Sequence, residues 1–282
     1  MCIVSIWNNL NKNYKIDFFK ITQFEKLFIT DIRVTLDNKL LNQKYVYASA
    51  CHDMKNISLI KALSELVERL VFLAPFVGPI EFINGKQYTP DINKHLIPLS
   101  LVTPYLSDKS TFSSPGHACH TDSNIAVNAS ENEYYEYYIK STLSDALSQA
   151  TLSEENDTEF KFNGLNDPTI LDAFKKIVIR YPSFYFCLVW HPVYSYVVGS
   201  ACNESKDIAI EKAFCEGLSL LHAAKKDEDN IDLIEDFKVD YTGIYPGYYV
   251  SSQIIPKPNI IRRHSQILSE LKLCMFQAVH HV

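Results

Sequence analysis

The sequence contains no apolar stretch long enough to cross a membrane. Its longest, residues 70–80, is interrupted by Pro75 and Pro79, whereas a membrane helix needs about 20 apolar residues. Residues 1–7 lack the basic start of a secretory signal and are predicted to form a strand. These absences predict a protein with no membrane contact and a cytoplasmic location.

Several common site motifs are also missing. The seven cysteines include no CxxC pair, so neither a zinc–thiolate site nor a thioredoxin-like redox pair is indicated, and reduced thiols are expected. The phosphate loop GxxxxGK[ST], the dinucleotide turn GxGxxG, and the motifs GxSxG and HExxH are absent as well. The net charge of −6, from 27 basic and 33 acidic residues, argues against general nucleic-acid binding.

What remains is an aromatic-rich globular chain of 282 residues, 47% hydrophobic and 21% charged. Its strand and helix patterns alternate, which predicts a single α+β domain over residues 1–282 with mixed sheets packed against helices. The predicted strands are residues 26–36 and 44–51 and an antiparallel pair at 183–190 and 193–201. The predicted helices are residues 58–74, 123–149, 169–180, 205–225 and 265–280.

Two of these helices carry glutamates three residues apart, Glu65 with Glu68 and Glu133 with Glu136. Like charges at this spacing repel each other on a helix, and both pairs are flanked by aliphatic or aromatic residues. An oxygen-rich cation site explains both observations, because hard cations such as Mg²⁺ take carboxylate oxygens together with substrate phosphates. Arg69, on the same face, could meet phosphate or orient a glutamate. The alternative is an amphipathic helix with charges on its solvated face.

Two further segments combine small residues with a helix that follows. Residues 114–120 contain His117, Cys119 and His120, but no tetrahedral zinc set with standard spacing accompanies them. Residues 199–202 read as a strand and turn before the third helix. The three helices share a weak internal repeat, an alanine followed by a glutamate, in the pairs Ala62/Glu65, Ala129/Glu133 and Ala213/Glu216.

In this order and spacing, the three segments resemble the signatures of the YcaO superfamily, ATP-dependent enzymes that activate peptide backbone amides. The first signature, S-A-L-x-E-A-x-E-R, is similar to residues 61–69. The second is matched by Ser114, Gly116, Ala118, His120, Ala126, Glu133 and Glu136. The third is matched by Gly199, Ala201, Ala213 and Glu216. The resemblance covers about residues 45–225.

The resemblance implies a site, a reaction and partners. Mg²⁺ would be held against the ATP phosphates by Glu65, Glu68, Glu133 and Glu136. The nucleotide would also be contacted by Arg69, Ser114 and Glu216. The implied chemistry is cyclodehydration of a Cys, Ser or Thr residue to an azoline, or formation of a thioamide or amidine, during maturation of a ribosomally made peptide or protein. A substrate-recognition partner and a homodimer are also implied, and no nucleic-acid or membrane partner is expected.

The sequence also departs from the family pattern. Lys61 stands at a nucleotide-contacting serine, Ile125 at a glutamate, Tyr137 at an arginine and Ser219 at a glutamine. The resemblance predicts a shortened carboxyl-terminal region over residues 226–282, without the Pro-rich tail of many cyclodehydratases. Arg262 and Arg263 are candidates for a replacement phosphate contact. A second hypothesis follows, in which a degenerate homologue binds a peptide or partner without turning over ATP.

Overall fold

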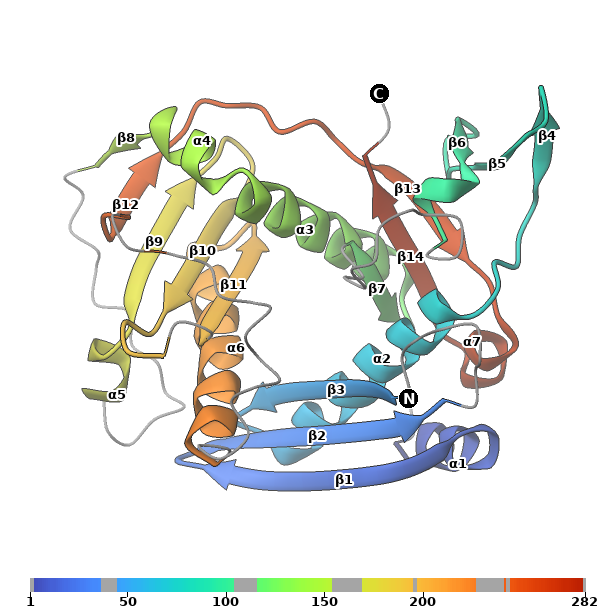
Figure 1. The fold of residues 1–282 in the computed structure, drawn as a ribbon, viewed down its shortest axis with the longest axis horizontal. Helices are drawn as coiled ribbons and strands as arrows, with labels where there is room; N and C mark the ends of the chain where they lie inside the picture. The colour runs from blue at the N-terminus through green and yellow to red at the C-terminus, as the bar shows by residue number, and fades with distance from the viewer. Residues whose placement is uncertain are drawn as a thin grey trace.

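Three strand–helix units of the same layout surround the centre of the molecule (Figure 1). The computed structural model describes residues 3–36, 45–103, 116–153, 169–194, 197–226, 241 and 244–280. The units are β3 (Tyr45–His52) with α2 (Lys55–Leu73), β7 (His117–His120) with α3 (Ser123–Ser141), and β11 (Val198–Asn203) with α6 (Lys206–Lys226). Each helix begins three residues after its strand ends, and each strand lies at the edge of its sheet.

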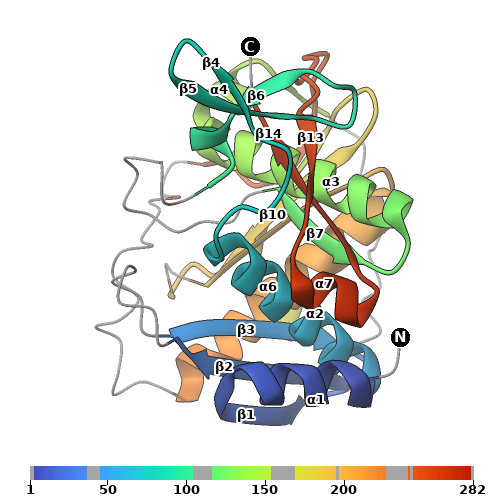
Figure 2. The same cartoon turned by 90° about the vertical axis from the view of Figure 1, so that its right-hand side faces the viewer.

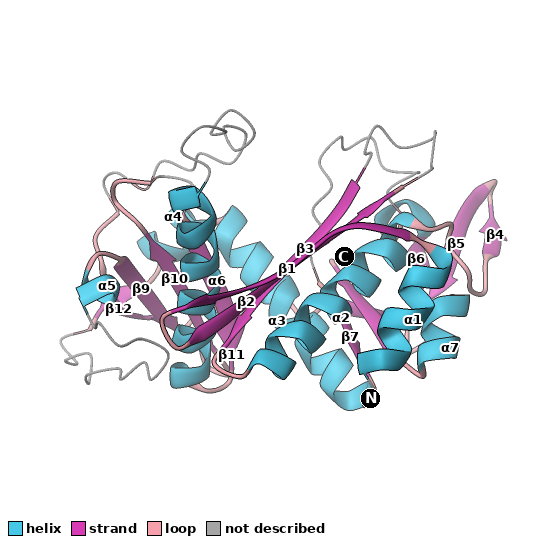
Figure 3. Ribbon diagram, turned by 90° about the horizontal axis from the view of Figure 1, so that it is seen from below, coloured by secondary structure: helices cyan, strands magenta, loops and turns pink. Residues whose placement is uncertain are grey.

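The first unit belongs to an antiparallel sheet. Its strands are β1 (Lys15–Phe24), β2 (Leu27–Thr35) and β3, in that order. One face of this sheet packs on α2 and on α1 (Ile3–Asn13), burying Ile32 and Val34 against Leu63. Seen from below in Figure 3, the sheet lies across the molecule, between the β9–β12 strands on one side and α1 with α7 on the other.

The amino-terminal strand prediction was wrong. Residues 3–13 form α1, because Ile6 and Leu10 recur at helical spacing and both are buried in the core shared with α2. Strand β1 follows directly and was not predicted. Its exposed pattern, with Phe18 and Phe19 both at least two-fifths exposed, lacks the regular apolar alternation that identifies a strand in sequence.

The third unit belongs to a mixed sheet covered on both faces. Its strand order is β11, β10 (Tyr185–Trp190), β9 (Lys175–Arg180), β12 (Gly247–Val250) and β8 (Thr151–Leu152). Helix α6 covers one face, where Val178 and Val189 meet Ala213. The end of α3 and α4 (Leu143–Ser148) cover the other, where Ile139 meets Ile177. A sheet buried on both faces needs strands that are apolar on both sides.

That double burial corrects the prediction of a helix at residues 169–180. The structure has a single helical turn, α5 (Thr169–Asp172), followed by β9. The β-branched run Ile177, Val178, Ile179 is buried at all three positions, as a central strand requires. The helix predicted at residues 265–280 splits in the same way, into α7 (Gln266–Leu271) and β14 (Cys274–Val279), with Lys272 in the left-handed conformation between them.

Two small sheets remain, and the second unit belongs to the first of them. One contains β13 (Asn259–Arg263), β14 and β7 in that order, and α3 packs on it through Ala126 and Tyr134. The other contains β4 (Glu81–Ile83), β5 (Lys86–Pro90) and β6 (Leu96–Pro98), followed by the 3₁₀ turn η1 (Leu99–Leu101). Figure 2 shows this last sheet at the opposite end of the molecule from β1–β3. No helix in the described ranges is long and apolar enough to span a membrane.

Arg263 has a structural role in the interior, whereas the sequence suggested it as a replacement phosphate contact. Its side chain is 3% exposed. Its guanidinium donates to the carbonyl oxygens of Val102 (2.7 Å) and Val71 (3.1 Å) and to Gln277 Oε1 (3.0 Å), and it stacks on Phe76. Arg263 thus joins α2, the end of η1 and β14 through the interior.

Candidate functional site

The three units repeat in detail at the turn between strand and helix. In each, the last strand residue accepts a hydrogen bond from the backbone N–H two residues later. The acceptors are His52 Nδ1 from Met54 (3.0 Å), His120 Nδ1 from Asp122 (2.9 Å) and Asn203 Oδ1 from Ser205 (2.9 Å). This side-chain turn substitutes for a backbone turn. Both histidines of residues 117–120 are therefore placed: His120 forms the turn, and His117 packs edge-on against Phe72.

A glutamate stands thirteen residues after the end of each strand: Glu65, Glu133 and Glu216. Each accepts the backbone N–H of the residue three positions before the strand end. The donors are Ser49 to Glu65, His117 to Glu133, and Ser200 to Glu216 Oε2 at 2.7 Å. Edge strands leave such N–H groups without a sheet partner, and the glutamates use them. The structure aligns Ser130, and not Ala129, with Ala62 and Ala213, because all three stand ten residues after the strand and are fully buried.

Three residues further along each helix, the side chain reaches the next unit. Glu68 accepts the Cys119 backbone N–H at 2.7 Å, linking α2 to β7. Glu136 accepts the Ser200 hydroxyl at 2.7 Å, linking α3 to β11. At the third helix this position is Ser219, whose hydroxyl contacts the Cys51 thiol and links α6 to β3. The three contacts join the units in a closed ring, which we call the glutamate ring after its five carboxylates.

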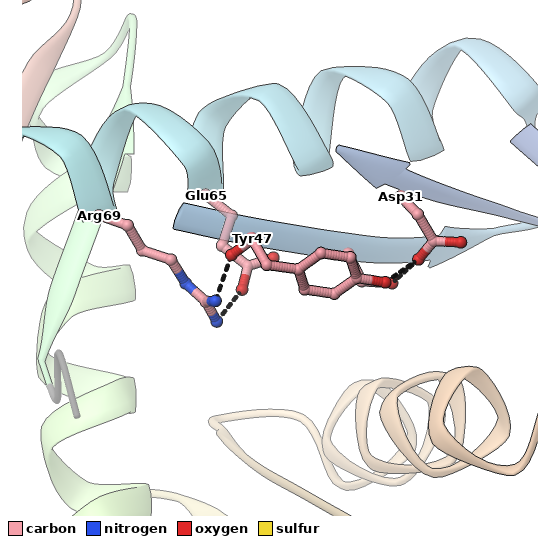
Figure 4. A network of polar contacts seen from close by, with 5 residues as sticks. Asp31, Tyr47, Glu65 and Arg69 are labelled. Atoms are coloured by element: carbon pink, nitrogen blue, oxygen red, sulfur yellow. Dashed lines mark hydrogen bonds and ion pairs between the residues drawn. The ribbon is translucent and has the colours of Figure 1, made fainter. Parts of the chain in front are cut away.

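Arg69 orients Glu65 within this ring. Its guanidinium donates to Glu65 Oε1 at 2.5 Å and to the backbone carbonyl oxygen of Tyr47 (Figure 4). The Tyr47 hydroxyl in turn donates to Asp31 Oδ1 at 2.5 Å, and Ser49 donates to the same oxygen at 2.8 Å. Because Arg69 is 41% exposed and Glu65 30%, their pair adds little to stability. Its effect is to fix the direction of Glu65.

Lysines lie close to the other carboxylates. Lys140 donates to the Ser200 hydroxyl at 3.0 Å, and that hydroxyl donates to Glu136. Lys212, one helical turn before Glu216, lies in the electrostatic range of Glu133 and Glu136. Sequence reasoning did not single out Ser200, Lys140 or Lys212. The signal that could have found Ser200 is its register, since it stands where Ser49 and His117 stand in the other units.

The five carboxylates are held in surroundings that disfavour their charged forms. Desolvation by the surrounding protein raises the pKa of Glu68 to about 8, and Glu65 adds to the shift. Desolvation, then Glu216, raises the pKa of Glu136 to about 8. The pKa of Glu133 lies well above its ordinary value because of desolvation and then of three glutamate neighbours. Four of the side chains are only partly exposed, whereas Glu216 is exposed and therefore more strongly screened by solvent.

This arrangement suits a cation that brings further ligands of its own. In the described part of the chain, no three carboxylate, imidazole or thiol side chains converge closely enough to hold a metal unaided. The donors at hand are carboxylate oxygens in two pairs, each fixed by backbone or hydroxyl donors. Mg²⁺ is commonly bound by one or two carboxylates, waters and substrate phosphates, and not by an all-protein cage. The donor set therefore fits magnesium with a phosphate ligand.

The structure thus brings together six of the seven predicted site residues: Glu65, Glu68, Arg69, Glu133, Glu136 and Glu216. Ser114 lies outside the described residues. Three of the departures from the family pattern are exposed positions: Lys61 is exposed, Ile125 is 51% exposed and Tyr137 is 46% exposed. Ser219, the fourth, occupies the third linking position of the ring.

Comparisons with known proteins agree with the fold. The sequence matches no protein-family model and no curated protein. The structure is similar to YcaO from Methanopyrus kandleri bound with AMPPCP and Mg²⁺, with a TM-score of 0.67, 11% identity, and coverage of 98% of this chain and 88% of that one. It is also similar to the E. coli microcin synthetase McbBCD complex, with a TM-score of 0.55, 14% identity, and coverage of 93% and 86%.

A third similar structure is a heterocyclase in complex with substrate and cofactor, with a TM-score of 0.56 and 12% identity. The match covers 94% of this chain and 49% of the heterocyclase chain. At these identities the likeness establishes the fold: the chain has a YcaO-like α+β fold, as the sequence predicted.

Proposed function

We propose that this chain is a divergent YcaO-like enzyme that uses Mg²⁺ and ATP to activate a peptide backbone amide. The observation that supports this most strongly is the glutamate ring, five carboxylates from three helices held by the edges of three sheets. The structurally similar M. kandleri protein is bound with AMPPCP and Mg²⁺. In this chain, Glu65, Glu68, Glu133 and Glu136 would hold Mg²⁺, and the ion would neutralise phosphoryl charge.

The other residues of the site have roles that follow from their contacts. Arg69, fixed on Glu65, presents its remaining donors to an anion. Lys140, bound through Ser200 to Glu136, supplies a second positive charge beside the ring. Rigid positioning by backbone donors is the main catalytic contribution expected of such a site, because phosphoryl transfer depends on alignment and charge stabilisation.

The proposed substrate is a peptide or protein whose Cys, Ser or Thr side chain attacks the preceding carbonyl. ATP would phosphorylate the resulting oxygen, and departure of phosphate would leave an azoline. A thioamide or amidine is the outcome if sulfide or an amine attacks instead. A substrate-recognition partner is part of the proposal, since the similar E. coli assembly is a microcin synthetase complex, McbBCD, also solved with pro-MccB17 bound. A homodimer is a further proposal.

Calorimetry with ATP tests the proposal at its first step. We expect binding that requires Mg²⁺ in the wild-type chain and is weakened at least tenfold in Glu65→Gln and Glu136→Gln, because each loses one carboxylate of the ring. Glu131→Gln is the matched control: it removes the same charge from the same helix as Glu136, but Glu131 is attracted by Lys257 and repelled by Glu204, both outside the ring. No binding at millimolar ATP in the wild type contradicts the proposal.

A second candidate function is a scaffold that binds a peptide or partner without ATP turnover. The observation that favours it is Ser219, which occupies the third linking position of the ring where the resemblance implies a glutamine. Magnesium-dependent nucleotide binding without phosphate release, measured with a candidate substrate and its partner protein present, supports this alternative over the enzyme.

A further inference from the structure

The third junction of the ring differs chemically from the other two. A cysteine stands one residue before the end of the strand in all three units: Cys51, Cys119 and Cys202. Next to Cys119 lies Glu68, and next to Cys202 lies Glu136. Next to Cys51 lie instead the hydroxyl of Ser219 and a second thiol, that of Cys215, one helical turn earlier on α6.

The two thiols at this junction touch. Cys51 and Cys215 share a side-chain hydrogen bond between β3 and α6, and both are free cysteines. Cys51 is 5% exposed, while Cys215 is partly exposed. Within α6, Ser219 donates to the Cys215 carbonyl oxygen at 2.9 Å. The two thiols are hydrogen-bonded neighbours and one belongs to a partly exposed residue, which makes the pair a candidate for a disulfide.

We propose that Cys51 and Cys215 form a redox modification site, a dithiol that a peroxide converts reversibly into a disulfide. One thiolate attacks a peroxide oxygen, the O–O bond breaks, and a sulfenic acid and the first water form. The partner thiol then attacks that sulfur, the S–S bond forms, and the second water leaves with the remaining proton. Each sulfur gives up one electron, and hydrogen peroxide is reduced to two waters. A dithiol reductant reverses the reaction.

The surroundings of Cys51 favour its thiolate form. The hydrogen bond from Cys215 lowers the pKa of Cys51, and Ser219 and the positive charge of Lys61 act in the same direction. Desolvation raises the pKa of the two equivalent cysteines, Cys119 and Cys202, and their glutamate neighbours raise it further. The thiolate is the reactive form of cysteine. Of the three equivalent cysteines in the ring, Cys51 is therefore the one suited to oxidation.

The location gives the modification a consequence. Cys215 immediately precedes Glu216, and Cys51 lies two residues after Ser49, which donates to Glu65. A disulfide would therefore tie together the two chain segments that position Glu65 and Glu216. The chemistry of the dithiol itself does not depend on the proposed nucleotide function.

Peptide mapping of the full chain tests the site directly. The reduced protein is treated with hydrogen peroxide, capped with N-ethylmaleimide and digested with trypsin without reductant. Residues 45–55 and 213–225 are tryptic peptides that each contain a single cysteine, Cys51 or Cys215. We expect a linked species of these two peptides lacking two hydrogens, and its disappearance with dithiothreitol. Separate capped or over-oxidised peptides, or Cys51 linked to another cysteine, overturn the proposal.

Cysteine-to-serine variants identify which two sulfur atoms are linked. The linked species should be lost in Cys51→Ser and in Cys215→Ser. It should persist in Cys202→Ser, which removes the equivalent cysteine of another unit. Persistence of the linkage in either of the first two variants contradicts the assignment. Because the wild-type result is decisive by itself, a variant that folds poorly does not leave the proposal without a test.

Discussion

At the scale of single residues, hydrogen bonds from the backbone fix the site glutamates without neutralising them. Glu68, Glu133 and Glu216 each accept an N–H from an edge strand. Such a donor contributes a partial charge, whereas an ion pair contributes a full one. In the described part of the chain, an ion pair is found at Glu65, with Arg69. When these glutamates are deprotonated, their negative charge is therefore available to a bound cation.

The same charge makes the stability of the metal-free protein depend on pH. Glu68 and Glu136 have a folded-state pKa of about 8, compared with 4.5 as the ordinary value. Between these values the folded state holds protons that the unfolded state releases, so the free energy of unfolding falls as the pH rises. Thermal unfolding in EDTA should show a melting temperature that decreases from pH 5 to pH 8. The double variant Glu68→Gln/Glu136→Gln should show a smaller decrease, and an equal decrease would contradict the assignment.

The sequence predicted the acidic residues of the site but not what holds them. Spacing alone places Glu65 with Glu68, and Glu133 with Glu136, on shared helix faces. The resemblance added Glu216. Ser200 could not be found in this way, because its contacts with Glu216, Glu136 and Lys140 are decided by tertiary packing.

At the scale of elements, Gly199 sets the distance between β11 and α6. A Cβ at this position would lie 1.9 Å from the Ala213 carbonyl oxygen and 2.6 Å from the Gly217 nitrogen. Both atoms belong to helix backbone, which cannot rotate away as a side chain would. The absence of a side chain here lets α6 approach the strand whose Ser200 holds two glutamates.

Replacing this glycine should push the helix and strand apart. We expect Gly199→Ala to lower the free energy of unfolding by about 3 kcal/mol or more, at the upper end for overpacking. Gly85→Ala is the control: Gly85 has a φ of +76°, but a Cβ added there would meet no heavy atom within 4 Å, so only the backbone strain of about 1 kcal/mol applies. Urea denaturation measures both. Equal losses would contradict close approach as the reason for Gly199.

Elements that bury one regular face were predictable, and those that depend on their neighbours were not. Helices α2 and α6 and strand β10 follow the predicted segments closely. The helix predicted at residues 123–149 is divided into α3 and α4, and the strand predicted at 193–201 begins only at Val198 in β11. Strands β9 and β14 were assigned to helices, because a continuous apolar run gives the same periodicity signal in a buried strand as in a buried helix. Only the helices on both faces of the β9 sheet identify β9 as a strand.

At the scale of the whole molecule, Arg263 connects parts of the chain that are far apart in sequence. Its carbonyl acceptors, Val71 and Val102, lie 192 and 161 residues away. Burial lowers the pKa of Arg263 to about 10, so its guanidinium remains charged at neutral pH. Carbonyl dipoles and the ring of Phe76 stabilise that charge.

Removing the guanidinium should leave buried carbonyl oxygens without donors. We expect Arg263→Met to lower the free energy of unfolding by about 3 kcal/mol, because unsatisfied buried acceptors are costly. Arg262→Met changes the neighbouring, exposed arginine of the same strand and should cost less than about 0.5 kcal/mol. Guanidinium chloride denaturation at neutral pH measures the difference. A small effect of Arg263→Met would show that the three acceptors find other partners.

The closed ring of strand–helix units also bears on folding and cooperativity. The contact of Glu68 with Cys119 spans 51 positions of the sequence, and that of Glu136 with Ser200 spans 64. The contact between Ser219 and Cys51 joins the third unit back to the first. Such long-range closure forms late, since loop entropy must be overcome before the contacts are gained. The carboxylates are therefore in place only when all three units have docked. A ligand that bridges them adds its binding free energy to the stability of the entire fold, so occupancy of the site and completion of folding are linked equilibria.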